Sequence, residues 1–448
     1  IVLGNSTVTG AYTVTATAEG GITDFTGDML DITGAATFTA ENNQSIILDS
    51  ANIFRNSSVT FTGAGGSLSN VTINDSGGTT TTGAFVLAAL TLTGNLSVTA
   101  GGAVTQTGVL VIPGNTTISA PNRAVTISNS SNNFTGAVSI EAHTVDLEDN
   151  NVDGLILGAS TVTGNYAVEA GTTITQSAAL AITGVTTLKA GAGNNITLEN
   201  TSNNFLNAVK ITRGTNVTLV DADTIDLGAS TVSGTYAVTA KLGNITQSGN
   251  LTVTNASTFE TEAPNGTILC GNSLCTSTGG TNAFSGTVKL TTTGSSGHAY
   301  IDNGTTALEI ANDTSVGGNL TLVSGHDNSG GLKAITDAGS LTVGGNLYAT
   351  TDANNGDIDL GGLVMSATTS KIQLTTHNNG AATVVNTKHL HFISADVGGN
   401  FIATATDGTI TQDSAFDIDG TSDFHSVSAD NIILDSAAND FTGDVRFR

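Results

Sequence analysis

The chain of 448 residues has no tryptophan, three prolines and two cysteines, and only 11% of its residues are charged. No run of eighteen apolar residues occurs, so the sequence predicts no membrane-spanning helix. Two cysteines fall short of the four ligands that a structural zinc site needs. Long-chain helix formers such as lysine, arginine, methionine and glutamine are scarce, which disfavours a helical fold.

The charge that is present is mostly negative. Thirty-seven acidic residues against twelve basic ones give a formal net charge of −25. This balance disfavours nucleic acid and anionic membranes as partners. The acidic residues are spread thinly along the chain, which is typical of a solvated surface that keeps molecules apart.

What fills the chain is glycine, threonine, asparagine, serine and alanine, with valine, isoleucine and leucine placed at alternate positions in short runs. Runs of three to five residues with period-2 alternation, separated by glycine, asparagine and aspartate, predict short strands joined by tight turns. The inward positions would be apolar, and the outward ones would be threonine, serine, asparagine and aspartate.

The chain is also a repeat. LGASTVTGNYAVEAGTTITQ, from residue 157, returns as LGASTVSGTYAVTAKLGNITQ from residue 227. Such repetition indicates stacked units that bury their apolar faces against one another. Each copy contains a TVTG-like glycine, at Gly10, Gly94, Gly164, Gly234, Gly318 and Gly399. We expect one continuous β-solenoid with copies at about residues 3–86, 87–156, 157–226, 227–310, 311–391 and 392–448, the last incomplete.

Three further elements recur within the copies. A large apolar residue lies two positions after the glycine, as in Tyr12, Leu96, Tyr166, Tyr236, Leu320 and Phe401. An I-T-Q-like element follows, beginning at Ile22, Val104, Ile174, Ile245, Ile335 and Ile410. A lone aromatic, usually within N-x-F, comes later, at Phe54, Phe134, Phe205, Phe284 and Phe441. With three strands per turn, the spacing predicts an all-β parallel β-helix of roughly 18–20 coils, each of roughly 23 residues.

Several segments resemble the repeats of large secreted bacterial proteins of the filamentous haemagglutinin type, namely LGASTVTGNY, ITQSGNLTVT, AGAGNNITLEN and SNNFTGAV. The resemblance covers nearly the whole chain and is strongest over residues 87–291. It implies a right-handed parallel β-helix, two-partner secretion to the bacterial cell surface, and a role in adhesion or in extracellular fibres. The family's amino-terminal secretion domain is absent from this sequence.

Candidate sites are few. Cys270 and Cys275 lie four residues apart within CGNSLC and would form a local disulfide in an oxidising exterior. Asp352, Asp357 and Asp359 surround a glycine turn as oxygen ligands for calcium would, although without an EF-hand spacing. His389 and His391 alternate and would face the same side of a strand, as a pair of metal ligands must.

We expect no catalytic centre, because basic residues are isolated and no elaborated loop forms a cleft wall. The sequence predicts a structural or adhesive rod that associates end to end or continues into a longer chain, with host or surface glycans as candidate partners. Two alternatives stay open: a glycan-binding or glycan-degrading β-helix, and a threonine-rich solenoid that binds ice. The many Asn-x-Ser/Thr triplets indicate stacked asparagines at turns, hydrogen-bonded to each other and to the backbone.

Overall fold

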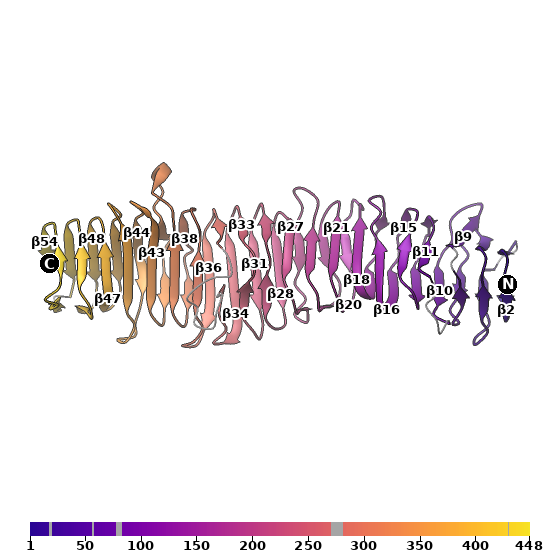
Figure 1. Cartoon of the computed structure of the whole chain (residues 1–448), viewed down its shortest axis with the longest axis horizontal. Coiled ribbons are helices and arrows are strands. Elements are labelled where there is room, and N and C mark those ends of the chain that lie inside the picture. The colour runs from indigo at the N-terminus through magenta and orange to yellow at the C-terminus, as the bar shows by residue number, and fades with distance from the viewer. Residues whose placement is uncertain (18–19, 56–57, 78–82, 270–280, 429) are drawn as a thin grey trace. The chain divides into compact units, whose positions relative to one another are not determined.

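The computed structural model describes residues 1–17, 20–55, 58–77, 83–269, 281–428 and 430–448. The chain divides into two compact units, Ile1–Thr215 and Asn216–Arg448. In each unit short strands stack in parallel, coil upon coil (Figure 1). The parallel β-solenoid predicted from the repeats is therefore confirmed, with about 19 turns in the two units together. The described chain contains 54 strands, close to the expected three per turn.

The third copy shows how one coil rests on the next. Three strands form a coil: β21 (Tyr166–Ala170), β22 (Ile174–Gln176) and β23 (Leu180–Ile182). The next coil contains β24 (Thr186–Lys189), β25 (Ile196–Leu198) and β26 (Asn204–Phe205). Each strand pairs in parallel with its counterpart one coil along. Tyr166 lies opposite Thr186, twenty residues further on, so one coil lies directly over the other.

The alternation of side chains follows from this stacking. In β21, Tyr166, Val168 and Ala170 are buried, whereas Ala167 and Glu169 face outward. Because each strand pairs in register with the strand of the next coil, inward side chains lie over one another and form continuous apolar columns. The same pattern recurs in β48 (Phe401–Ala405), which lies between β46 (Ala382–Asn386) and β51 (Ser422–Ser426).

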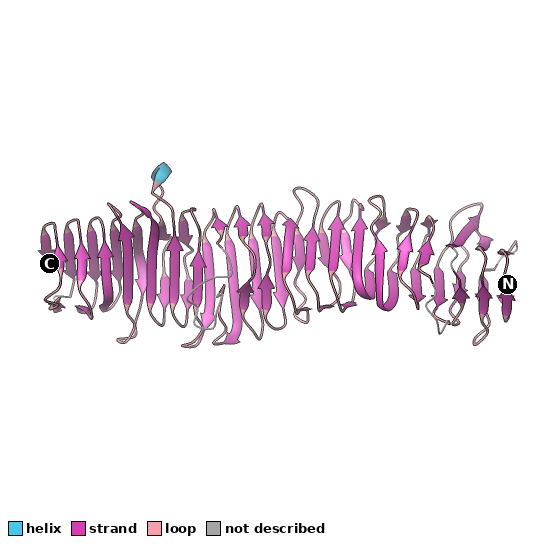
Figure 2. Ribbon diagram, in the orientation of Figure 1, coloured by secondary structure: helices cyan, strands magenta, loops and turns pink. Residues whose placement is uncertain are grey.

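Departures from the regular stack occur as register shifts within a few strand pairs and as loops that protrude from it. Figure 2 shows strands almost throughout, with one helical turn at the tip of a protruding loop. This turn, η1 (Ser329–Gly331), is the single helical element of the described chain, and it buries no side chain. No helix within the described residues is long and apolar enough to cross a membrane.

Glycines at the corners after short strands lie where successive coils touch; Gly164 is one of the TVTG-like glycines, and Gly184 is its counterpart one coil along. Gly184 occupies the corner that follows β23, directly over Gly164, and donates a backbone hydrogen bond of 3.1 Å to the Gly164 carbonyl. A Cβ atom on Gly184 would lie 2.3 Å from the Gly164 carbonyl carbon. The repeat keeps glycine there because backbone atoms of adjacent coils leave no room for a side chain.

We therefore expect Gly184→Ala to lower the free energy of unfolding by about 1–3 kcal/mol, the range for overpacking a close contact. Gly10→Ala is the matched control, since a Cβ atom on Gly10 would meet nothing within 4 Å. Urea denaturation of the two variants checks this. Equal losses in both variants would contradict the contact between coils as the reason for glycine.

Candidate functional site

The most regular polar feature of the interior is a pair of facing amides. The glutamine of the I-T-Q-like element and the asparagine that begins N-x-F hydrogen-bond to each other across one coil. The pairs are Gln106 with Asn132, Gln176 with Asn203, Gln247 with Asn282, and Gln412 with Asn439. We call them the Gln–Asn clamps.

The clamp at Asn203 illustrates the geometry. Gln176 Nε2 donates to Asn203 Oδ1 at 2.8 Å, and Asn203 Nδ2 donates back to Gln176 Oε1 at 2.9 Å. Asn203 Oδ1 also accepts the backbone N–H of Leu180 at 3.0 Å, and Asn203 itself is fully buried. A buried amide that satisfies backbone groups in this way fixes the register of one coil on the next.

Two copies lack the glutamine and have an aspartate in its place. In the first copy Asp24 Oδ2 accepts from Asn52 Nδ2 at 2.8 Å, so a carboxylate completes the clamp. In the fifth copy Asp337 instead accepts the backbone N–H of Gly362, and burial raises the pKa of Asp337 above its ordinary value. The fifth copy is thus the one whose coils are joined differently.

A second set of asparagines lies at the corners that precede the strands. Asn70 Oδ1 accepts the backbone N–H of Asn95 at 2.8 Å, Asn95 Oδ1 accepts that of Asn115 at 2.8 Å, and Asn115 Oδ1 accepts that of Ala137 at 3.1 Å. The second unit repeats the arrangement from Asn319 to Asn346. The predicted stacking of asparagines at turns is confirmed.

This corner ladder also explains why Asn-x-Ser/Thr triplets are so frequent. The asparagine occupies the corner, the next residue points inward and is usually apolar, although Thr116 takes this place after Asn115, and the third points outward and is often serine or threonine. In Asn95-Leu96-Ser97, Leu96 is buried and Asn95 Oδ1 accepts the backbone N–H of Asn115. The triplet follows from the strand pattern.

The three aspartates predicted to bind calcium have separate surroundings. Asp352 is exposed near the end of β43 (Leu347–Asn354). Asp357 Oδ1 accepts the backbone N–H of Ala381 at 2.8 Å, and Asp359, in β44 (Ile358–Val364), forms an ion pair with Lys333. Within the described chain no group of three or more histidine, cysteine, aspartate or glutamate side chains is arranged to hold a metal. The geometry gives calcium binding at these residues no support.

The two histidines also bind different partners. His389 Nδ1 accepts the backbone N–H of Thr409 at 3.1 Å, while His391 Nε2 lies 2.7 Å from Asp413 Oδ1. Asp413 also binds Lys371, and these two neighbours hold the pKa of the Asp413 carboxyl below its ordinary value. Lys371, Asp413 and His391 thus form a charged network on the outer surface, with no metal group among the described residues.

The predicted disulfide between Cys270 and Cys275 falls within residues 270–280, outside the described residues. It stays a prediction.

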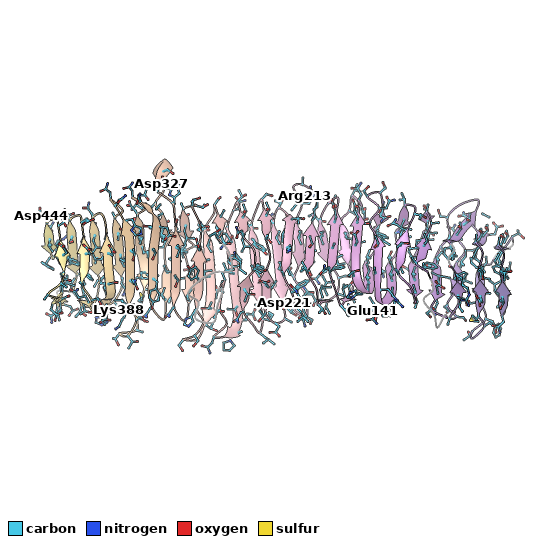
Figure 3. The ribbon with its side chains drawn as sticks, viewed as in Figure 1. Glu141, Arg213, Asp221, Asp327, Lys388 and Asp444 are labelled. Atoms are coloured by element: carbon cyan, nitrogen blue, oxygen red, sulfur yellow. The ribbon has the colours of Figure 1, made fainter. Side chains whose placement is uncertain are left out.

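The surface of the second unit has shallow polar recesses. One, of about 660 Å³, is lined by asparagines, glycines, Ala381 and Asp419, with no lysine or arginine among its lining residues. A second, of about 530 Å³, shares Asn355 with it and includes His326 and Asp327 beside the protruding loop. Figure 3 labels Asp327 near this loop and Lys388 at the opposite edge of the unit in this view.

Carboxylates also stack in a column on this unit. Asp417, in β50 (Phe416–Ile418), lies in register between Asp396 and Asp440. Partial burial and the like charges of Asp396, Asp440 and Asp419 raise the pKa of Asp417. The carboxylates of Asp396, Asp417 and Asp440 therefore lie one strand apart along the surface, and the charged neighbours that shift the pKa of Asp417 are all acidic.

Taken together, coil-on-coil pairing, internal clamps and corner ladders define a repeat protein of the parallel β-solenoid class. The chain belongs to the family described as "Repeats of unknown function (DUF5649)", whose model matches residues 1–62, 68–141, 142–212, 214–291 and 378–448. Residues 292–377 lie outside these matches and include the protruding loop. No curated protein and no solved structure matches the chain.

Proposed function

We propose that this chain is the structural or adhesive rod of an extracellular bacterial fibre or cell-surface exoprotein. The observation that carries the proposal is the continuous hydrogen bonding between successive coils, in which backbone pairs, Gln–Asn clamps and corner asparagines all run along the stacking direction. Such a stack resists bending and local opening, because few backbone groups are left free at its sides. The resemblance to filamentous haemagglutinin-type repeats supports secretion and the bacterial surface as its location.

The proposed role is non-catalytic. Asp357 and Asp359 are held by the backbone of Ala381 and by Lys333, and Asp417 belongs to an outward column. A glycan-degrading site would need two carboxylates flanking one bond within roughly 10 Å in a cleft. The larger recess is shallow and lined mainly by asparagines and glycines, which supports contact with host or surface glycans more than their cleavage.

End-to-end association of subunits, or continuation into a longer chain, is part of the same proposal. Strand β54 (Val445–Phe447) pairs with β51 on one side, and Phe447 is 58% exposed. A further coil, from the same or another chain, would cover this apolar side chain and pair the strand.

Electron microscopy of the native material tests the proposal. Continuous fibres with a repeat near one chain length support end-to-end assembly, and isolated thin rods support a shaft that does not assemble. Compact globular particles would overturn the rod itself.

A second candidate function, ice binding, has one specific observation in its favour. Outward threonines fall in register on three successive strands, β3 (Tyr12–Thr15), β6 (Ala36–Glu41) and β9 (Ser58–Ala64). The columns are Thr13, Thr37 and Thr60, and Thr15, Thr39 and Thr62. This is a flat two-by-three array of methyl and hydroxyl groups. Freezing-point depression beyond the colligative value, lost in Thr37→Tyr, would support it, and its absence in the unaltered chain would exclude it.

A further inference from the structure

The further inference concerns a buried carboxylate that closes the coil of the first copy. Asp75, the last residue of β10 (Val71–Asp75), is only 1% exposed. Its Oδ1 accepts the backbone N–H of Phe54 at 2.8 Å. Its Oδ2 is buried and has no hydrogen-bond partner within the described chain. An unsatisfied buried carboxylate oxygen is costly while the group is ionised.

Two other copies hold an asparagine at the corresponding place. Asn303 Oδ1 accepts the N–H of Phe284 at 2.7 Å, and Asn303 Nδ2 donates to the Phe284 carbonyl at 3.1 Å. Asn386 makes the same two bonds to Met365, at 2.8 and 3.1 Å. At these sites an amide hydrogen occupies the position where Asp75 presents a bare oxygen. A protonated Asp75 would present an O–H group there.

Few charged groups surround Asp75. On the packed segments, Asp49 follows β7 (Ile46–Leu48) and is exposed, and Arg55 follows β8 (Ile53–Phe54) and is paired with Asp31. Asp24 binds Asn52, and β13 (Leu96–Ala100), which pairs with β10, has no titratable side chain. No cation therefore compensates the Asp75 carboxylate within this described surrounding.

We propose that Asp75 is a proton-operated latch: its neutral form closes the coil on both the N–H and the carbonyl of Phe54, and ionisation releases the second bond. Burial supports this, because it raises the pKa of Asp75 to about 6, opposed by the Phe54 hydrogen bond. An unfolded aspartate titrates near 3.9. Between about pH 4 and about pH 6 Asp75 binds more protons in the folded chain than in the unfolded one, so its contribution to stability falls as pH rises through this window and is flat above it.

Asp149 is a related but different case. Its Oδ1 accepts the N–H of Phe134 at 2.9 Å, and its Oδ2 accepts that of Asn151 at 3.2 Å. Burial raises the pKa of Asp149 to about 6, yet both oxygens are satisfied and Asn151 already binds the Phe134 carbonyl. Glu148 on the same strand and Glu169 on β21 are its titratable neighbours. A proton on Asp149 therefore has no free carbonyl to bind at Phe134.

Hydrogen exchange tests the latch, with the Phe284 amide as the internal reference. From about pH 5 to about pH 7.5, we expect the protection of the Phe54 amide relative to the Phe284 amide to fall about tenfold. D75N should raise protection at about pH 7.5 to its value at about pH 5. In the reciprocal N303D, the Phe284 amide should gain the pH dependence when it is measured against the Met365 amide, which Asn386 holds in the same way.

Two results would overturn the proposal. One is a Phe54 amide whose relative protection does not change with pH in the unaltered chain. The other is D75N raising or lowering protection equally at both pH values, which would indicate a structural effect independent of the proton. The D75N arm decides the matter even where N303D does not fold.

Discussion

Asn203→Ala is expected to lower the free energy of unfolding by about 4 kcal/mol, the largest effect that one amide of this chain should produce. The substitution leaves the buried N–H of Leu180 without its acceptor and the Gln176 amide without either of its bonds to Asn203. Each unsatisfied buried group costs about 1–3 kcal/mol. Urea denaturation, with hydrogen exchange of β22 and β23, measures the loss and locates it.

The neighbouring Asn204→Ala is the matched control. Asn204 Oδ1 is buried without a hydrogen-bond partner, so its removal leaves no bond of that oxygen broken. We expect a change below about 1 kcal/mol. Similar losses in the two variants would show that the clamp does not determine how firmly the coils hold together.

Phe401→Ala is the second substitution with a large expected effect. The Phe401 ring is fully buried, and its centroid lies 5.6 Å from that of Phe392, 5.9 Å from that of Phe416 and 5.6 Å from that of Phe424. Truncation removes these contacts and leaves a cavity that a parallel stack cannot close, at a cost of about 4 kcal/mol. Thermal unfolding of the second unit reports the loss.

Phe401→Leu is its control, because other copies already hold leucine at this position, as at Leu96 and Leu320. We expect a cost of about 1–1.5 kcal/mol, since most of the volume is kept. If leucine and alanine cost the same, the ring contacts rather than the filled volume would be the source of stability at this position.

The strands could be predicted from the sequence because alternation and stacking impose the same pattern. A residue that points inward in one coil, such as Val168, contacts Leu188 in the next coil. The alternation of apolar and polar residues within each strand is therefore kept even where the turns between strands differ in length. The corner asparagines could be predicted for a related reason, since each one precedes the first inward residue of a strand. Both features depend on neighbours within a few positions.

The Gln–Asn clamps could not be predicted from local pattern. Their partners are 26 residues apart at Gln106, 27 at Gln176 and 35 at Gln247, because the intervening turns differ in length. The sequence does contain a signal, since each of these I-T-Q-like elements is followed by an N-x-F motif whose asparagine is the partner. Only the coil geometry shows that the two amides meet.

The candidate metal ligands illustrate the opposite limit. Asp357 and Asp359 are close in sequence, but Asp357 precedes β44 and accepts the backbone N–H of Ala381, whereas Asp359 lies within β44 and pairs with Lys333. Neighbouring coils supply a partner to each of these carboxylates, so their proximity in sequence does not make them ligands of one ion.

Disulfide cross-linking between register partners tests the stacked-coil account most directly. Thr105 lies opposite Thr126 on the next coil. Thr187 lies in the same column, four strands away from Thr105. With Cys270 and Cys275 replaced by serine, Thr105→Cys with Thr126→Cys should form an intramolecular disulfide, because adjacent parallel strands lie about 4.8 Å apart. Thr105→Cys with Thr187→Cys should not, since about 19 Å separates these strands. Failure of the first pair, or equal cross-linking of both, would contradict the parallel stack on which the proposed rod depends.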